Sequence, residues 1–365
     1  MLKKFEVRNF KSFKNPLVFD FSNIRDYEFN DDLIKDGIMT KSLIYGMNNS
    51  GKSNLGAAIM DITTHLTDNS GEENPIYNYY INGDSTEKYA EFTYTFSFNQ
   101  KEVVYHYFKS SPTTVLKEEL LVQDELIFSY NYQTGDYINE IPEAKSIDIS
   151  KNNTDMDVLK YIYKNTMYWP EESLVNKTMS FVDSMLWFRS LQHNEYIGKS
   201  STNENLHDFV VKNNLVKDFE IFLGKCGQHF KLGTTLYGNK EIISVKYKHT
   251  EVPFNSVASS GTLALWLFYY WMRKNKKISF LYLDEFDAFY HYELSEYILK
   301  YVNSEKYFQS VLTTHNIYLM SNELMRPDCY LILEDGKISS LADRTNKTIR
   351  IAHNLEKMFI GGEFD

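Results

Sequence analysis

One stretch, Gly46–Ser53, constrains the fold more than any other part of the chain. Its sequence, Gly-Met-Asn-Asn-Ser-Gly-Lys-Ser, fits the pattern G-x-x-x-x-G-K-[ST], which is typical of a phosphate-binding P-loop. The preceding residues, Ser42–Tyr45, are typical of a short buried strand, and apolar residues recur at helical spacing from Asn54 to Leu66. The chain is therefore expected to pass from a strand through this loop into a helix.

The residue types in the loop suit the binding of a nucleotide. Gly46 and Gly51 allow a tight turn and a close approach of the backbone to phosphate oxygens. Backbone N–H groups and the N-terminus of the helix direct positive polarity toward those oxygens. Lys52 is expected to reach the β- and γ-phosphates, and the Ser53 hydroxyl to ligate Mg²⁺. The predicted ATP-binding residues of the loop are Gly46, Asn48, Asn49, Ser50, Gly51, Lys52, Ser53 and Asn54.

Two further strand ends carry residues suited to phosphate chemistry. The apolar run Ile278–Leu283 leads directly into Asp284 and Glu285. An aspartate in this position beside a P-loop can hold Mg²⁺, and the adjacent glutamate can polarise the attacking water as a general base. A second strand, Ser310–Thr314, is followed by His315, which we expect to bond the γ-phosphate.

An anion site is also expected where the strongly apolar helix Thr262–Arg273 begins. Ser260 and Gly261 offer a hydroxyl and backbone N–H groups at the N-terminus of that helix. This feature alone is typical of an ordinary helix cap, and its position shortly before Asp284 makes it informative.

The order of the elements predicts an α/β fold. Strand and helix patterns alternate around the P-loop and again after residue 259, which indicates a mostly parallel sheet flanked by helices. We therefore expect a nucleotide-binding domain from residues 1–66 and 248–365, with a mixed α+β insertion at 67–247 that forms a β-strand region and a helical lid or arm. Predicted elements within this insertion are strands at 90–98, 103–108 and 114–122 and helices at 155–164, 171–188 and 206–224.

Composition restricts the cellular location and the binding partners that are expected for this chain. The two cysteines, Cys226 and Cys329, lie far apart without metal-ligand spacing, which predicts a reducing, cytoplasmic location. The longest apolar run, Leu263–Met272, is too short to span a bilayer, so no membrane association is expected. A net charge of −10 disfavours broad coating of DNA, although a local basic groove remains open.

Taken in order, these motifs resemble the ABC-type ATPases of the SMC/RecF/OLD class, and most closely the compact OLD-like AAA-family ATPases found in bacterial anti-phage defence systems. The resemblance extends to the first-strand motif Asn9–Phe13, the stretch Asp284–His291 and the segment Leu355–Phe364. It implies an ABC-type core with an additional antiparallel β portion. It also implies that Lys11 and Ser12 approach the nucleotide.

The resemblance further implies ATP and Mg²⁺ as cofactors and a homodimer or higher homo-oligomer. In this class, ATP lies between the P-loop of one subunit and the Ser260-Gly261 signature of the other. Ser-Ser-Gly-Thr fits the OLD-like branch better than the Leu-Ser-Gly-Gly-Gln of transporters. The sequence leaves two candidates for the Q-loop glutamine, Gln192 and Gln123. Little sequence follows His315, so we expect no nuclease domain and instead a separately encoded effector, a nuclease or a toxin.

Three functions remain open from the sequence. The first is an ATP-hydrolysing switch in anti-phage defence that controls the separate effector. The second is a RecF-like DNA-repair ATPase, which requires a basic strip. The third is a scaffold that holds ATP with slow turnover, and the intact Glu285 argues against it. The residues that could supply a basic strip are Lys3, Lys4, Arg8, Lys11 and Lys14.

Overall fold

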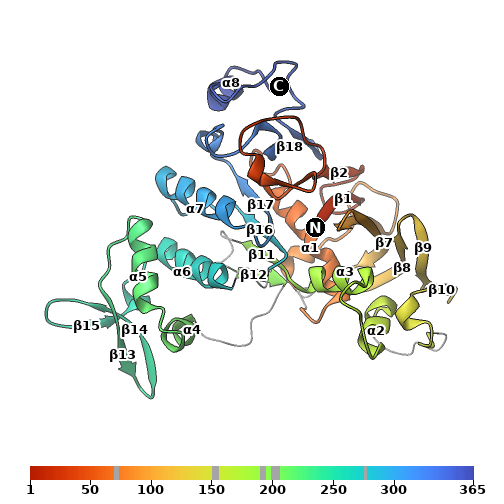
Figure 1. The fold of residues 1–365 in the computed structure, drawn as a ribbon, viewed down its shortest axis with the longest axis horizontal. Coiled ribbons are helices and arrows are strands. Elements are labelled where there is room, and N and C mark those ends of the chain that lie inside the picture. Colours follow the sequence, from red (N-terminus) through yellow and green to blue (C-terminus); the bar gives the residue numbers. More distant parts are fainter. Residues whose placement is uncertain (70–73, 150–155, 190–194, 199–205, 275–277) are drawn as a thin grey trace.

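The computed structural model describes residues 1–69, 74–149, 156–189, 195–198, 206–274 and 278–365 (Figure 1). The helices are α1 Lys52–Leu66, α2 Val158–Asn165, α3 Leu174–Asp183, α4 Leu206–Lys212, α5 Val216–Lys225, α6 Ser260–Arg273, α7 Tyr292–Ser304 and α8 Leu355–Ile360. The strands of the first half are β1 Leu2–Arg8, β2 Leu17–Asp20, β3 Ile34–Lys35, β4 Ile38–Met39, β5 Lys41–Tyr45, β6 Ala90–Phe98, β7 Lys101–Ser111, β8 Thr114–Val122, β9 Glu125–Asn131 and β10 Tyr137–Asn139. Those of the second half are β11 Met185–Arg189, β12 Glu195–Gly198, β13 Leu232–Tyr237, β14 Lys240–Lys246, β15 Glu251–Pro253, β16 Phe280–Asp284, β17 Gln309–Thr314, β18 Tyr330–Glu334 and β19 Lys337–Ser340.

A central, mostly parallel sheet carries the P-loop. Its seven strands run in the order β12-β11-β16-β17-β5-β18-β19, and every neighbouring pair from β11 to β18 is parallel. The edge strands β12 and β19 are antiparallel to their neighbours. All residues of β16 and β17 are buried, as expected for parallel strands covered on both faces. The predicted α/β class is confirmed.

A second, antiparallel sheet forms the additional β portion. Its seven strands run in the order β10-β9-β8-β7-β6-β1-β2. Buried and partly exposed residues alternate along β6, with Ala90, Phe92, Tyr94 and Phe96 facing inward. This alternation places one face of the sheet against the core and leaves the other face more open to solvent.

Helix α1 lies between the two sheets, and nearly all of its residues are buried. A Cβ added to Gly56 would come within 2.9 Å of Trp187 and Tyr282, so the helix approaches the central sheet too closely for a side chain there. On its other side, the Tyr94 hydroxyl donates to the Ala58 carbonyl at 2.8 Å. Figure 1 shows α6 and α7 on the opposite side of the central sheet from α1.

The predicted helix over 171–188 is wrong in its second half. Helix α3 ends at Asp183, and Met185–Arg189 forms strand β11 beside β16 in the central sheet. Every residue of β11 is buried. A short, continuous apolar run fits a buried strand and a buried helix equally well, so periodicity did not distinguish them. The predicted helix over 206–224 is likewise divided into α4 and α5 by a turn in which Asn214 adopts a positive φ of 55°.

Strands from the middle of the chain share both sheets with strands from its flanks. Strand β6 pairs with β1, and β11 pairs with β16. The region that sequence patterns mark as an insertion, 67–247, thus contributes to the sheets that support the P-loop. Strands β13 and β14 of this region form a separate three-stranded sheet with β15, and this sheet lies near α4 and α5 (Figure 1). The division at 66 and 248 stays a prediction.

In the described part of the chain, no helix combines the length and apolar character needed to cross a membrane.

A buried carboxyl group, Glu118 on β8, makes stability depend on pH. Glu118 accepts hydrogen bonds from Tyr105 at 2.7 Å, from Tyr132 at 2.6 Å and from the Leu159 amide at 3.2 Å. Burial raises its pKa from 4.5 to about 7, and nearby Asp157 adds to the shift. Between these two values the folded protein binds more protons than the unfolded chain, so stability falls as pH rises through this window.

We therefore expect Glu118→Gln to remove most of this dependence. Guanidinium unfolding at a series of pH values should show the wild-type free energy of unfolding falling by up to about 3 kcal/mol between pH 4.5 and 7. In Glu118→Gln the slope should be much smaller. Glu119→Gln, at the next position of β8, should retain the wild-type slope, and an unchanged slope in Glu118→Gln would contradict the assignment.

Candidate functional site: a P-loop beside two acidic residues and a histidine

The P-loop connects β5 to α1 as its sequence predicts. Gly51 precedes α1 with a φ of 104°, a left-handed conformation that favours glycine. A Cβ on Gly46 would lie 2.4 Å from the Ser50 Oγ and 2.9 Å from the Leu333 carbonyl oxygen, so this position is also sterically restricted. Lys52 Nζ donates to the carbonyl oxygens of Gly46 at 2.8 Å and Met47 at 3.1 Å. The loop thus curves around the lysine ammonium group.

The first-strand motif lies against the beginning of α1. Ser12 Oγ accepts a hydrogen bond from Asn54 Nδ2 at 2.9 Å, and it lies 3.0 Å from the Cβ position of Gly51. Lys11 Nζ instead donates to the Asn78 carbonyl at 2.6 Å, and burial lowers its pKa. The structure therefore brings Ser12 to the P-loop, whereas the ammonium group of Lys11 points to a neighbouring loop.

Asp284 and Glu285 lie at the carboxyl end of β16 and are connected through Thr313. The Thr313 hydroxyl donates to Asp284 Oδ1 at 2.9 Å and accepts from the Glu285 amide at 2.7 Å. Asp284 also forms a side-chain hydrogen bond with Ser53, which lowers its pKa against the larger raising effect of burial. The carboxylate of Asp284 and the hydroxyl of Ser53 therefore meet in one place.

Those two groups fit the predicted Mg²⁺ site. Mg²⁺ prefers oxygen ligands and is usually held by one or two protein groups together with phosphates and waters. Asp284 and Ser53 offer a carboxylate and a hydroxyl oxygen in contact beside the P-loop. No cluster of three or more histidine, cysteine, aspartate or glutamate side chains suited to a metal occurs among the residues that the structure describes.

Glu285 adopts a backbone conformation that is uncommon for a residue other than glycine. Its φ is 46°, in the left-handed region, which costs on the order of 1–3 kcal/mol for a residue other than glycine. The hydrogen bond from its amide to Thr313 holds this conformation. Residues in such conformations concentrate at active sites, where the surrounding structure fixes them.

His315 connects Glu285 to the P-loop lysine. Its Nε2 lies 3.2 Å from Glu285 Oε1 and 3.0 Å from Lys52 Nζ. Burial lowers the pKa of Lys52, while the charges of Glu285 and Asp284 oppose that shift. The structure thus places His315, the predicted γ-phosphate sensor, in contact with both the P-loop lysine and the predicted general base.

The Ser260-Gly261 signature lies elsewhere in the same chain. Ser259 caps α6, because its Oγ accepts a hydrogen bond from the Thr262 amide at 3.2 Å. Ser260 at the start of the helix is exposed. A Cβ on Gly261 would lie 3.2 Å from the Phe289 carbonyl oxygen, which places the signature against the segment that follows Glu285. The predicted contact of Ser260 and Gly261 with ATP bound to a second subunit therefore stays a prediction.

Arg189 at the end of β11 is a neighbour of the site that sequence patterns did not identify. It stands opposite Asp284 in the register of β11 and β16, is 2% exposed, and its charge lowers the pKa of Asp284. Its guanidinium donates to Asn74 Oδ1 at 3.1 Å. Recognising 185–189 as a parallel strand would have placed Arg189 at the same sheet edge as Asp284.

The structure describes one of the two glutamine candidates for the Q-loop. Gln192 lies outside the described residues. Gln123 lies in the turn between β8 and β9, where its Oε1 accepts a hydrogen bond from the Glu102 amide at 2.5 Å. Gln123 thus belongs to the turn of an antiparallel hairpin.

Comparison with known proteins gives one partial family match. A family model described as "AAA domain, putative AbiEii toxin, Type IV TA system" matches residues 228–321, which include the signature, Asp284, Glu285 and His315. The P-loop lies outside the matched segment. No curated protein matches the chain. The segment that carries the two acids and the histidine is thus similar to an AAA-type ATPase domain.

The solved structures found to be similar are distant. An SMC head domain with a coiled coil and joint from Pyrococcus yayanosii is 11% identical, with a TM-score of 0.49 over 99% of both chains. The SMC head domain from Thermotoga maritima is 17% identical, with a TM-score of 0.44 over 93% of this chain and 97% of that one. The recombination mediator protein RecF with ATP is 15% identical, with a TM-score of 0.39 over 93% and 99%. At these scores the likeness carries no conclusion about activity or partners.

Proposed function

We propose that this chain is an ATP-hydrolysing switch that dimerises head-to-tail around ATP and Mg²⁺. The observation that carries the proposal is the contact of His315 with both Glu285 and Lys52, beside the hydrogen bond of Asp284 to Ser53. These groups are what phosphoryl transfer to water requires: a cation on the phosphates, an oxygen site for Mg²⁺ and a base for the attacking water.

Each residue has a role in this proposal that follows from its position. Lys52 and the N-terminus of α1 neutralise the phosphate charge. Ser53 and Asp284 hold Mg²⁺, which supplies further charge stabilisation when it is bound. Glu285 accepts a proton from the attacking water, and His315 orients Glu285 and bonds the γ-phosphate.

The second subunit supplies the remaining donors. Ser260 and Gly261 begin a helix of 14 residues, α6, and Ser260 is exposed to solvent. Its hydroxyl and N–H groups are suited to bond the γ-phosphate held by the other subunit. Because half of the donors then come from a partner, a monomer should bind ATP but hydrolyse it slowly.

The wider role that we propose is control of a separate effector, a nuclease or toxin, in anti-phage defence. The support is the family resemblance of the motifs together with the match to a domain described as a putative AbiEii toxin of a type IV toxin-antitoxin system. This support is analogy between folds and not a feature of one residue. A cytoplasmic location belongs to the same proposal.

The structure gives little support to RecF-like DNA binding along β1. Along β1, Lys3 pairs with Glu102, Lys4 with Glu6, and Arg8 with Glu87 and Glu91. The positive charge that a basic strip would need on this strand is thus balanced by neighbouring carboxylates, and such exposed pairs are screened by salt.

The experiment that tests the switch measures ATPase rate per subunit against protein concentration. Assembly of the site from two subunits predicts that the specific rate rises with concentration and then reaches a plateau once dimers dominate. Analytical ultracentrifugation with and without ATP should show dimers over the same concentration range. A specific rate that does not change with concentration, in a protein that remains monomeric with ATP, would overturn the dimer mechanism.

A further inference from the structure

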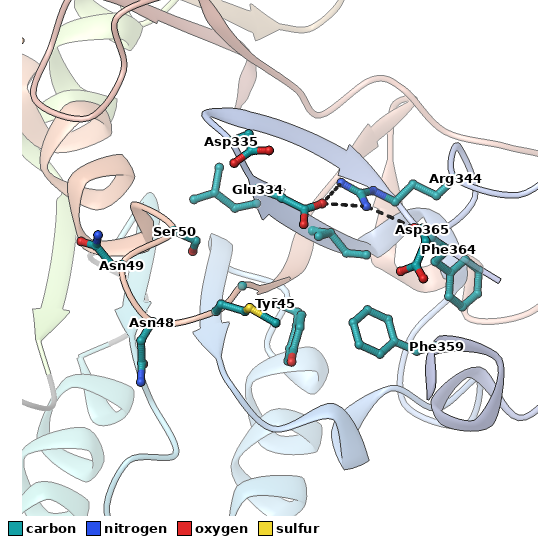
Figure 2. Close-up of a pocket in the computed structure, with 14 residues that line it drawn as sticks. Tyr45, Asn48, Asn49, Ser50, Glu334, Asp335, Arg344, Phe359, Phe364 and Asp365 are labelled. Atoms are coloured by element: carbon teal, nitrogen blue, oxygen red, sulfur yellow. Dashed lines mark hydrogen bonds and ion pairs between the residues drawn. The ribbon is translucent and has the colours of Figure 1, made fainter. Parts of the chain in front are cut away.

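A pocket lies beside the P-loop, on the side away from Glu285. Figure 2 shows it between the loop, the hairpin of β18 and β19, and α8 with the segment that follows it. Its volume is about 390 Å³. Aromatic rings form part of its wall, and carboxylates stand at its rim. These aromatic and acidic residues are Tyr45, Phe359, Phe364, Glu334, Asp335 and Asp365.

The rings and the carboxylates make this pocket suited to a long cationic side chain. The Tyr45 and Phe359 rings meet edge to face, with centroids 5.0 Å apart. Such rings can contact the aliphatic part of a lysine and attract its ammonium group. The wall is therefore apolar where the stem of a lysine would lie, and the rim is acidic where its charge would end.

The acidic charge at the rim is only partly balanced. Arg344 donates to Glu334 at 3.2 Å and to the Phe364 carbonyl at 3.1 Å, so its charge is engaged. Asp335 and Asp365 are exposed and take part in no hydrogen bond or ion pair within the described ranges of the chain. Two free carboxylates thus flank an aromatic wall.

A matching cation lies next to the signature at the other side of the molecule. Lys225 is the last residue of α5, is exposed, and forms no hydrogen bond or ion pair in the part of the chain that the structure covers. Three residues further on, Gln228 accepts a hydrogen bond from the Thr262 hydroxyl at 2.8 Å, in the first turn of α6. This bond fixes the end of α5 beside the signature.

The order of the central sheet determines what a second copy would place over the pocket. The signature lies against Phe289, after β16, whereas the pocket lies at β18, and the P-loop strand β5 is between them. Figure 1 shows α5 beyond α6, on the side away from β18. In a two-fold dimer, the signature of one subunit lies over the P-loop of the other subunit. Helix α5 of the first subunit then lies near β18 of the second.

We propose that the pocket receives Lys225 of a second copy of this chain, with Asp335 as the principal partner of its ammonium group. The proposal rests on the head-to-tail dimer proposed above and extends it by a contact outside the ATP site. The pocket adjoins Asn48, Asn49 and Ser50 of the P-loop. Seating the lysine would therefore connect closure of the dimer to the loop that holds the phosphates.

A charge exchange tests the contact. In full-length Glu285→Gln protein with ATP and Mg²⁺, the dimer dissociation constant is measured by ultracentrifugation for Asp335→Lys, Lys225→Asp and the combination of both. Each single reversal should weaken the dimer by roughly tenfold, because the symmetric dimer contains the contact twice. The combination should restore affinity to within roughly threefold. Lys217→Asp, on the same helix α5, is the matched control and should change little.

A cross-link tests the position of the two residues directly. Asp335→Cys and Lys225→Cys proteins are prepared separately and mixed with ATP and a short bis-maleimide. The native cysteines, Cys226 and Cys329, are buried and serve as an internal control in the unmodified chain. A covalent dimer should form in the mixture and not with either variant alone.

The outcomes separate this contact from the proposed function. Absence of any ATP-dependent dimer in Glu285→Gln would remove the switch mechanism and this contact together. Three results would overturn the Lys225 contact alone. Both single reversals could leave dimer affinity unchanged, the combination could fail to restore it, or no cross-link could form. In that case the pocket belongs to another occupant, and the dimer stands without it.

Discussion

Glu285→Gln should lower the ATPase turnover number by roughly 10²- to 10⁴-fold while leaving ATP binding intact. Glutamine keeps the size of the side chain and can still accept a hydrogen bond from His315, which lies 3.2 Å from the carboxylate in the wild type. It cannot accept a proton from the attacking water at neutral pH. Substrate should therefore bind and the dimer should close, but the chemical step should be very slow.

The expected signature of this variant is an accumulated ATP-bound dimer. Single-turnover assays should show the loss in the rate of phosphate formation, and ultracentrifugation with ATP should show more dimer than in the wild type. Glu293→Gln is a suitable control, because Glu293 is an exposed carboxylate on α7. A Glu285→Gln protein that turns over ATP at the wild-type rate would remove Glu285 from the role of general base.

Sequence patterns predicted those parts of the fold where the pattern is typical of only one kind of structural element. The P-loop pattern demands a strand before it and a helix after it, and β5 and α1 lie there. Alternating residues in 90–98 marked a half-buried strand, and β6 spans those residues. The stretch 185–189 has apolar residues on both faces and no alternation, so its pattern did not distinguish a helix from the strand β11.

The same distinction holds for the candidate site. Residues in short motifs, such as Lys52 and Asp284, can be assigned from spacing because the chemistry fixes their neighbours along the chain. Arg189 could not be assigned, because its nearness to Asp284 arises from pairing of β11 with β16, which are far apart in sequence. Likewise, the acidic pocket near Asp335 is assembled from segments that lie far apart in the sequence. Such arrangements depend on tertiary structure and leave no local pattern.

Lys109→Met should destabilise the fold by about 3–5 kcal/mol, the second large effect that we expect. Lys109 on β7 and Asp61 on α1 form an ion pair at 3.0 Å, and both side chains are 0% exposed. Lys109 also donates to Thr64 at 2.7 Å, and Asp61 accepts from the hydroxyls of Tyr80 and Tyr107. Methionine fills a similar volume but leaves the Asp61 carboxylate buried without a counter-charge.

The pair matters for function because it joins the P-loop helix to the antiparallel sheet. Denaturant unfolding, followed by circular dichroism, should show the loss in Lys109→Met and a smaller loss in Asp61→Asn combined with Lys109→Met, since the double variant buries no net charge. Lys164→Met is the matched control: its pair with Asp68 is exposed by 40% and 71%, and such pairs contribute about 0–1 kcal/mol. Equal losses in Lys109→Met and the double variant would mean that packing, and not the buried charge, holds α1 to β7.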